Sequence, residues 1–385
     1  MKVLALAGDA GGARTLSPVL KRLAAQPGIT LQVQAYAAAV EIWRREGWPV
    51  SPVNVAAVPS CDRLLLGTSW QPEQWELEAI AVARQAGIRS ASVLDSWVNY
   101  RVRFLNRHGE FVLPDAIAVM DESAKREMLG EGFPTERLAV TGHPSFDELE
   151  RFCSVEAQTT ARERILQAFE VPLTPSLSPT GGEGARRAGE GDSDARKAPA
   201  VTPIFLFASQ PISQMADGAS WGFDEHLVLA DLSAALDATL RAHGQKAVLL
   251  VKRHPRETDE LTLPKAASLS IRVVDDSLGD YRELVAASDF VLGMNSNLLL
   301  EACLLGKPVI SYQPGLLRPD PLPSNRLGWS RAVTARDALG PALAEEIFDD
   351  SRRRSRKELL RSLPRPSGAA ERVMRLLLES HGCNS

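Results

Sequence analysis

The sequence predicts an α/β protein built from two doubly wound domains, each with a parallel sheet between layers of helices. Short apolar runs alternate with amphipathic stretches from the first residues onward, which is the pattern of successive β–α–β units. This pattern stops near residue 172 and starts again at Pro203, so it divides the chain in two. A length of 385 residues also favours two domains over one core.

The composition is that of an ordinary globular protein and excludes several classes. A net charge of -4 gives no bulk attraction to nucleic acid or to an anionic membrane. The four cysteines show no C-x-x-C spacing, so neither a zinc site nor a disulfide framework is indicated, which fits a reducing cytoplasm. The apolar start is too short for a signal peptide, and no stretch is long enough to span a bilayer. We therefore expect a cytoplasmic protein, which in a membrane pathway would act as a peripheral partner.

The first domain is expected to cover residues 1–148. Its predicted strands are residues 1–7, 30–36, 63–67, 90–94, 116–120 and 138–141, and its predicted helices are residues 37–45, 75–86 and 123–130. Ser17 and Pro18 have the residue types of a helix N-cap and first turn, which predicts a further helix that begins there and ends near residue 26. The segment before it, residues 8–16, is then a glycine-rich loop.

Two segments of the first domain place polar groups at the carboxyl ends of strands. The glycine-rich loop lacks G-x-G-x-x-G spacing, which argues against a dinucleotide site, but Gly11 and Gly12 would let its backbone approach a ligand closely. The segment after the fourth strand holds Asp95 and Trp97, where a sugar could hydrogen-bond and stack. The alternative is a surface loop whose Trp97 packs inward.

The second domain is expected to cover residues 149–365, with an insertion at residues 172–199. The insertion is rich in Pro, Ser, Gly and Arg and cannot bury enough apolar surface to offset its ordering entropy, so we predict that it is disordered. The predicted strands are residues 203–208, 247–251, 271–274, 290–292 and 309–312, and the predicted helices are residues 148–170, 226–243, 281–287, 298–305 and 338–347. Residues 352–357 are strongly basic, and we expect them to be solvated.

The clearest motif lies at residues 288–312, where a strand, a polar turn, a helix and a second strand predict a right-handed parallel crossover. Gly306 suits the left-handed position after a helix. The polar turn lies at the carboxyl edge of the sheet, where a helix N-terminus offers N–H groups to an anion. Asn295, Ser296 and Asn297 add side-chain donors, so the turn predicts a phosphate site. The alternative is that Asn295 or Ser296 only caps the helix.

Other residues of the second domain extend this phosphate site. Glu301 follows within about a turn and a half of helix and could accept hydrogen bonds from a sugar attached to the phosphate, unless its carboxylate is merely solvated. Lys252, Arg253 and His254 follow another strand, which we expect to neighbour strand 290–292. Two cations and an imidazole can neutralise and hydrogen-bond a phosphate. Ser209, after the first strand of this domain, is a further candidate.

Three stretches resemble the GT-B superfamily. Residues 289–310 are similar to the nucleotide-binding stretch of CDP-glycerol glycerophosphotransferases, capsule sugar transferases and UDP-N-acetylglucosamine 2-epimerases. Residues 116–149, with Gly142-His143-Pro144 and Asp147, resemble the end of the N-terminal domain in the same superfamily. The run Arg253-His254-Pro255 resembles the HP motif of the CMP-sugar and CDP-glycerol transferases.

The resemblance implies two Rossmann-like doubly wound domains that face a cleft, the GT-B fold. It implies that the helix within residues 366–385 packs back on the first domain, and that the loop after the first strand faces an acceptor. It also implies that His254, Ser296 and, less closely matched, Asn297 hold the phosphates of a nucleotide-activated donor.

Catalysis by clamping a departing nucleoside phosphate would need no metal and no cofactor, because fixed cations and N–H groups stabilise the developing charge. It would need a base for the acceptor hydroxyl. The candidates are Asp9, Asp95 and His143, and the glycine-rich loop makes Asp9 the first of them. His143 stands where relatives often have Asn or Tyr, which favours a backbone or hinge role for it.

The leading hypothesis is a glycosyltransferase, or a glycerophosphotransferase-like enzyme, that uses a nucleotide-sugar or CDP/CMP-linked donor and a glycan, lipid-linked or protein acceptor. The first alternative is a nucleotide-sugar epimerase or hydrolase. It is weakened because the epimerases carry two adjacent glutamates where this chain has Leu300 and Glu301. The second alternative is a non-catalytic nucleotide-sugar binder. No nucleic-acid partner is expected.

Overall fold

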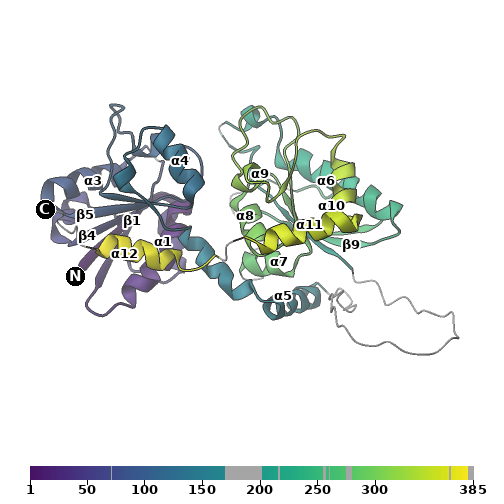
Figure 1. The fold of residues 1–385 in the computed structure, drawn as a ribbon, viewed down its shortest axis with the longest axis horizontal. Coiled ribbons are helices and arrows are strands. Elements are labelled where there is room, and N and C mark those ends of the chain that lie inside the picture. Colours follow the sequence, from purple (N-terminus) through teal and green to yellow (C-terminus); the bar gives the residue numbers. More distant parts are fainter. Residues whose placement is uncertain are drawn as a thin grey trace. The chain divides into compact units, whose positions relative to one another are not determined.

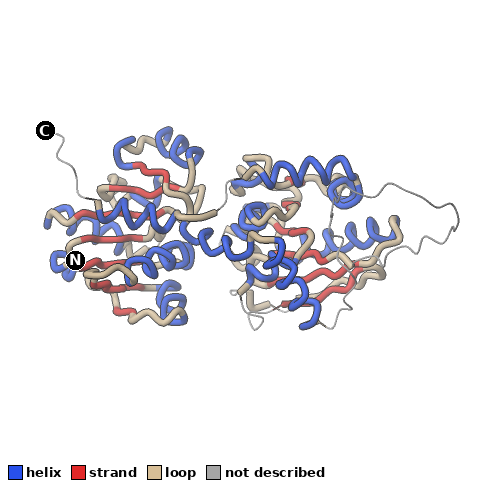
Figure 2. Tube along the Cα trace, turned by 60° about the horizontal axis from the view of Figure 1, so that its bottom comes forward, coloured by secondary structure: helices blue, strands red, loops and turns tan. Residues whose placement is uncertain are grey.

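The computed structural model describes residues 1–70, 72–169, 202–215, 217–254, 257–259, 261–274, 280–363 and 366–379. They form two compact units, one of Met1–Glu150 with the described part of Arg365–Ser385, and one of Arg151–Pro364. In each unit a parallel sheet lies between helices (Figures 1 and 2). The predicted fold class, two Rossmann-like doubly wound domains, is confirmed. The predicted disordered insertion at residues 172–199 lies outside the described residues.

The first unit contains a seven-stranded sheet in the order β3-β2-β1-β4-β5-β6-β7. Its strands are β1 (Lys2–Ala7), β2 (Thr30–Ala35), β3 (Val50–Ser51), β4 (Arg63–Leu66), β5 (Arg89–Val93), β6 (Ala116–Val119) and β7 (Leu138–Val140). Its α-helices are α1 (Ala10–Ala24), α2 (Ala37–Arg45), α3 (Trp75–Ala86), α4 (Glu122–Gly130) and α12 (Ala369–Leu378). The strand order reverses between β1 and β4, and such a switch point is where open α/β sheets bind ligands.

Helix α1 begins at Ala10 and not at Ser17, so the prediction of a glycine-rich loop was wrong. Asp9 is the N-cap, because its side chain accepts a hydrogen bond from the Gly12 N–H group at 2.7 Å. Pro18 therefore lies inside the helix, where its missing N–H removes a helical hydrogen bond. Gly11 and Gly12 belong to the first turn of this helix.

Alternate residues of the strands serve two layers of core in the first unit. Val3, Ala5 and Ala7 of β1 pack against α1 and α12, whereas Leu4 and Leu6 pack on the opposite face against α3. Helix α12 lies beside α1 in Figure 1 and completes the first of these layers.

The second unit contains a six-stranded sheet in the order β10-β9-β8-β11-β12-β13. Its strands are β8 (Ile204–Ala208), β9 (Ala247–Lys252), β10 (Leu269–Val274), β11 (Phe290–Gly293), β12 (Val309–Tyr312) and β13 (Arg331–Val333). Its α-helices are α5 (Val155–Ala168), α6 (Glu225–Ala242), α7 (Tyr281–Ala287), α8 (Asn297–Leu304), α9 (Pro323–Arg326), α10 (Leu339–Phe348) and α11 (Asp350–Arg361). The expectation that β9 and β11 are neighbours was wrong, since β8 lies between them.

The basic stretch at residues 352–357 is part of α11 and is not uniformly solvated. Arg356 is buried, and its guanidinium pairs with the buried Glu346 carboxylate at 3.0 Å. It also donates to the backbone oxygens of Gly328 and Trp329. A charge count along the sequence cannot distinguish this one arginine from its exposed neighbours.

None of the helices in the described ranges combines the length and the apolar character that a membrane crossing requires.

Candidate functional site

The crossover predicted around residue 296 is present in the second unit. Parallel strands β11 and β12 flank α8, and Gly306 takes the left-handed φ of 76° after the helix. Ser296 is the N-cap of α8, and its hydroxyl accepts a hydrogen bond from the Leu298 N–H group at 3.2 Å. The capping role that the sequence left open is therefore real. The Asn297 side chain is exposed.

The turns after β8, β9 and β11 are joined to one another at the carboxyl edge of the sheet. The Asn295 N–H group donates to Gln210 Oε1 at 3.0 Å, and the Ser209 N–H group donates to the Lys252 oxygen at 2.9 Å. Among the described residues, the Ser209 Oγ and Asn295 Nδ2 atoms are buried without a hydrogen-bond partner. Leaving such a group unpaired costs about 1–3 kcal/mol. A polar ligand at this edge would satisfy both atoms.

Not all the side chains of the turn after β9 are available to a ligand at this edge. The Arg253 guanidinium donates to the backbone oxygens of Glu257 and Asp259, so this side chain holds its own loop. The His254 N–H group donates to Glu257 Oε1 at 3.0 Å, which fixes the backbone that carries the half-buried imidazole. Lys252 Nζ lies 5.9 Å from the centre of the Tyr281 ring. Pro255 lies outside the described residues.

Glu301 is not solvated. Its side chain is buried in α8, and Oε1 accepts a hydrogen bond from the Tyr281 hydroxyl at 2.9 Å. The Arg282 Nε atom lies 3.9 Å from the other carboxylate oxygen. Tyr281 therefore connects the Glu301 carboxylate with the Lys252 side chain, so two of the predicted donor residues lie close together.

In the first unit, the switch point between β1 and β4 brings Asp9 against Ser69. The Ser69 Oγ atom accepts hydrogen bonds from the N–H groups of Gly8 at 2.8 Å and Asp9 at 3.0 Å. Burial and, next, repulsion from Asp95 raise the pKa of the Asp9 carboxyl group, against the N–H hydrogen bond from Gly12. Among the described residues no ion pair involves Asp9. A carboxyl group with a raised pKa suits a base that works near neutral pH.

Asp95 lies beside Asp9 but is engaged differently. Its carboxylate forms a buried ion pair with Arg103 at 2.7 Å, and the same guanidinium nitrogen donates to the Thr68 oxygen at 2.7 Å. Asp95 Oδ2 also occupies the space beside Gly11, where an added Cβ would lie 1.8 Å from it. Gly11 therefore admits a neighbouring carboxylate and does not line an open loop.

His143 and Trp97 are packed inside the first unit. The His143 ring stacks with Trp97 and with Phe146, with centroid distances of 5.5 Å and 4.2 Å, and its nitrogens contact Ser145 Oγ and the Asp95 backbone oxygen. Burial lowers the pKa of His143, so the ring is neutral. Trp97 is also buried and donates to Asp121 Oδ2 at 2.6 Å. The inward packing that the sequence left open is therefore what Trp97 does, and its ring has no free face for a sugar.

Several site residues were not among the sequence candidates, namely Ser69, Arg103, Glu76 and Tyr36 in the first unit and Gln210 in the second. Ser69 follows β4 and Gln210 follows β8, and each of these strands borders the point where the strand order of its sheet reverses. The rule that ligands bind at such points could therefore have found both residues. Arg103 reaches Asp95 from the short 3-10 helix Arg101–Phe104, which no periodic pattern indicates.

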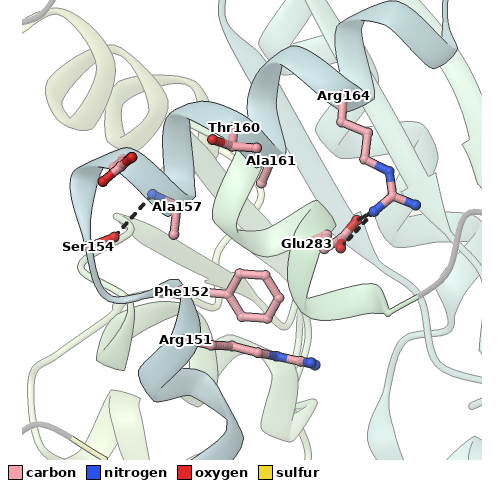
Figure 3. A pocket seen from close by; sticks show the side chains of 9 residues that line it. Arg151, Phe152, Ser154, Ala157, Thr160, Ala161, Arg164 and Glu283 are labelled. Carbon is pink, nitrogen blue, oxygen red and sulfur yellow. Dashed lines mark hydrogen bonds and ion pairs between the residues drawn. The ribbon is translucent and has the colours of Figure 1, made fainter.

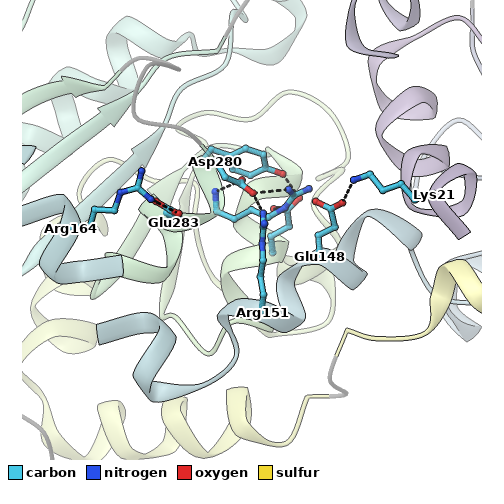
Figure 4. A network of polar contacts seen from close by, with 9 residues as sticks. Lys21, Glu148, Arg151, Arg164, Asp280 and Glu283 are labelled. Atoms are coloured by element: carbon cyan, nitrogen blue, oxygen red, sulfur yellow. Dashed lines mark hydrogen bonds and ion pairs between the residues drawn. The ribbon is translucent and has the colours of Figure 1, made fainter. Parts of the chain in front are cut away.

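A separate cavity of about 450 Å³ lies between α5 and α7 (Figure 3). It is lined in part by Phe152, Ser154 and Thr160, and it contains none of the predicted site residues. Its arginines already have carboxylate partners, because Arg164 pairs with Glu283 at 2.8 Å and Arg151 pairs with Asp280 (Figure 4). This cavity therefore offers no unpaired cation to an anionic ligand.

Comparison with known proteins gives a clear result for the fold. No protein-family model and no curated protein matches the chain. The structure of UDP-GlcNAc 2-epimerase from Neisseria meningitidis bound to UDP-GlcNAc aligns over 99% of this chain and 100% of its own, with a TM-score of 0.63 and 14% identity.

Two further structures agree. Acinetobacter baumannii MurG aligns over 98% of this chain and 99% of its own, with a TM-score of 0.57 and 12% identity. Anabaena Alr3699/HepE in complex with UDP-glucose aligns over 98% of this chain and 96% of its own, with a TM-score of 0.54 and 13% identity. The chain has the GT-B fold. At these identities the GT-B likeness concerns the fold alone.

Proposed function

We propose that this GT-B chain is a glycosyltransferase, or a glycerophosphotransferase-like enzyme, that moves a group from a nucleotide-activated donor to a glycan, lipid-linked or protein acceptor. The observation that carries the proposal is the pair of buried, unpartnered polar atoms, Ser209 Oγ and Asn295 Nδ2, beside the N-terminus of α8. A phosphate and its sugar would complete these hydrogen bonds. The structural neighbours bound to UDP-GlcNAc and UDP-glucose support a nucleotide-linked ligand.

In this proposal the donor phosphates lie at the carboxyl edge of β8, β9 and β11. The N–H groups in the first turn of α8, together with Lys252 and His254, balance the charge that develops on the departing nucleoside phosphate. Arg253 acts indirectly, by holding the loop that carries His254. The Glu301 carboxylate and the Tyr281 oxygen accept hydrogen bonds from sugar hydroxyls. The proposed chemistry requires no metal, because these groups already supply the positive charge.

Asp9 is the proposed base for the acceptor hydroxyl, because its pKa is raised and it is not ion-paired among the described residues. The alternative of a nucleotide-sugar epimerase has support from the fold of its structural neighbours. We rank it second, because Glu301 has the buried, apolar Leu300 beside it in place of a second glutamate. A single carboxylate supplies only one member of the acid/base pair that the two adjacent glutamates provide in the epimerases.

We expect His254→Ala and Ser296→Ala each to weaken nucleotide binding by about 10- to 100-fold, which is the effect of one hydrogen bond to a charged group. Calorimetric titration with CMP, CDP, UDP and GDP measures this and identifies the donor class. Ser154→Ala is the matched control for Ser296, because Ser154 caps α5 in the same unit by the same kind of contact, at 3.1 Å from the Ala157 N–H group. His226→Ala is the control for His254→Ala, because it removes an exposed histidine of the same unit. Unchanged affinity in both site variants would refute the proposed site.

Asp9→Asn is expected to keep nucleotide affinity and to lower transfer by about 10²- to 10⁴-fold, the usual contribution of a general base. Asparagine is as good an N-cap as aspartate, so α1 should be preserved. The measurement is release of the nucleotide from the donor that calorimetry selects. An Asp9→Asn protein with full activity would move the role of base to Asp95.

A further inference from the structure

A second buried carboxyl group lies behind Asp9, in what we call the Glu76 cluster, which consists of Tyr36, Ser69 and Glu76. The three residues come from different elements, since Tyr36 follows β2, Ser69 follows β4 and Glu76 lies in the first turn of α3. The Tyr36 hydroxyl donates to Glu76 Oε2 at 2.6 Å. The Ser69 oxygen accepts the N–H groups of Gly8 and Asp9, and the Ser69 hydroxyl is one of the groups that favour the ionised form of Glu76.

The backbone fixes the geometry of the Glu76 cluster. The Tyr36 ring packs directly on Gly8, where an added Cβ would lie 2.1 Å from the ring carbon Cζ. Glu76 itself is only 3% exposed. Contacts therefore connect the Glu76 carboxylate through the Tyr36 side chain with Gly8, the residue before Asp9.

Another carboxyl group acts on the buried Glu76 side chain. Asp9 is among the charges that affect Glu76, and Asp95 and Arg103 in turn affect Asp9. Burial and, to a lesser degree, repulsion from Asp9 raise the pKa of Glu76 to about 7, although hydrogen bonds from Ser69 and Tyr36 favour its ionised form. Burial and the Glu76 carboxylate also raise the pKa of the Tyr36 phenol.

We propose that Glu76 is a positioning residue for Asp9: the Glu76 carboxylate holds the Tyr36 hydroxyl, the Tyr36 ring packs on Gly8 in the turn between β1 and α1, and the Glu76 charge acts on the Asp9 carboxyl group that follows this turn. The inference rests on the proposed function only where it treats Asp9 as the base. The contacts and the coupling between the two carboxyl groups are independent of that role.

The coupling has a defined sign. As pH rises through about 7, Glu76 ionises, and its negative charge makes Asp9 a stronger base. The same raised pKa means that the contribution of Glu76 to folding is fully present below its ordinary pKa of 4.5 and is lost as pH rises through about 7. Glu76→Gln should remove this part of the pH dependence.

Infrared titration of the protonated carboxyl band tests the inference on the full chain. The wild type should show a carboxyl band that disappears as pH rises through about 7, and Glu76→Gln should lack it. Asp9→Asn should move the midpoint to lower pH, because it removes a repelling charge. Glu78→Gln is the matched control, since it removes an exposed carboxylate from the same turn of α3 and should leave the midpoint unchanged.

A midpoint that Asp9→Asn leaves unchanged, or a band that persists in Glu76→Gln, would overturn the inference. If Glu76→Gln does not fold, Tyr36→Phe serves instead, because loss of a hydrogen bond to the ionised form should raise the midpoint. The titration needs no nucleotide. A chain that binds none would therefore refute the proposed function and leave this test intact.

Discussion

A chain that ends at Leu363 is expected to lose the folded state of its first unit. Such a chain lacks α12, whose buried Val373, Met374 and Leu377 fill the core against α1. Full burial of a large apolar side chain contributes about 1.5–3 kcal/mol, so three of them contribute at most about 5–9 kcal/mol. This is comparable to the whole stability of a domain, about 5–15 kcal/mol.

Polar contacts at both ends of α12 add to this loss. Asp147 accepts hydrogen bonds from the first N–H groups of the helix, those of Ala369 at 2.9 Å and Ala370 at 2.8 Å. At the other end, Arg63 and Arg89 donate to the backbone oxygens of Leu377 and Leu376, both at 3.1 Å. Removing the helix would remove all four of these hydrogen bonds from the first unit.

Denaturant unfolding followed by tryptophan fluorescence measures the effect of truncation, because most of the tryptophans lie in the first unit. A chain that ends at Glu379 is the control, since it keeps every described contact of α12. If the chain ending at Leu363 unfolded at the same denaturant concentration as this control, α12 would not stabilise the first unit.

Gly11→Ala is expected to lower the free energy of unfolding of the first unit by about 3–5 kcal/mol, the cost of breaking a buried ion pair. The new Cβ would lie 1.8 Å from Asp95 Oδ2, and the Asp95 carboxylate cannot move away without disturbing its ion pair with Arg103. Alanine is otherwise favoured over glycine in a helix by about 1 kcal/mol. Without the contact to Asp95, Gly11→Ala would therefore raise the free energy of unfolding instead of lowering it.

The controls for Gly11→Ala are two other helical glycines. Gly130 lies at the end of α4 in the same unit and Gly340 lies in α10, and neither has an atom within 4 Å of its added Cβ. Gly130→Ala and Gly340→Ala should therefore be neutral or stabilising. Equal stability of all three variants would show that the space beside Gly11 is not filled as described.

Most of the helices and strands could be predicted because local sequence patterns determine them. Helices 37–45, 75–86 and 281–287 and strand 309–312 were predicted with the bounds that the structure has, since a glycine or polar residue ends each apolar pattern. The start of α1 was missed because Ser17 and Pro18 fit a helix start by type, whereas Asp9 caps the helix through a contact visible only in three dimensions.

The candidate site was predictable where it depends on the order of elements, and not where it depends on packing. The carboxyl edge after β11 follows from the crossover pattern, so Asn295, Ser296 and Asn297 could be placed there. The direction of a side chain could not be predicted. Trp97 packs inward and Arg253 turns to its own loop because of neighbours that are distant in sequence or irregular in structure.

We expect a nucleoside diphosphate to bind at the carboxyl edge of β8, β9 and β11, at the N-terminus of α8. Hydrogen–deuterium exchange of the full chain, alone and saturated with UDP, CDP or GDP in turn, tests this directly. We predict slower exchange in peptides that contain residues 209–210 and 294–301 with the nucleotide that binds. Slower exchange confined to the cavity beside Phe152 and Ser154, with no change at residues 294–301, would contradict the claim.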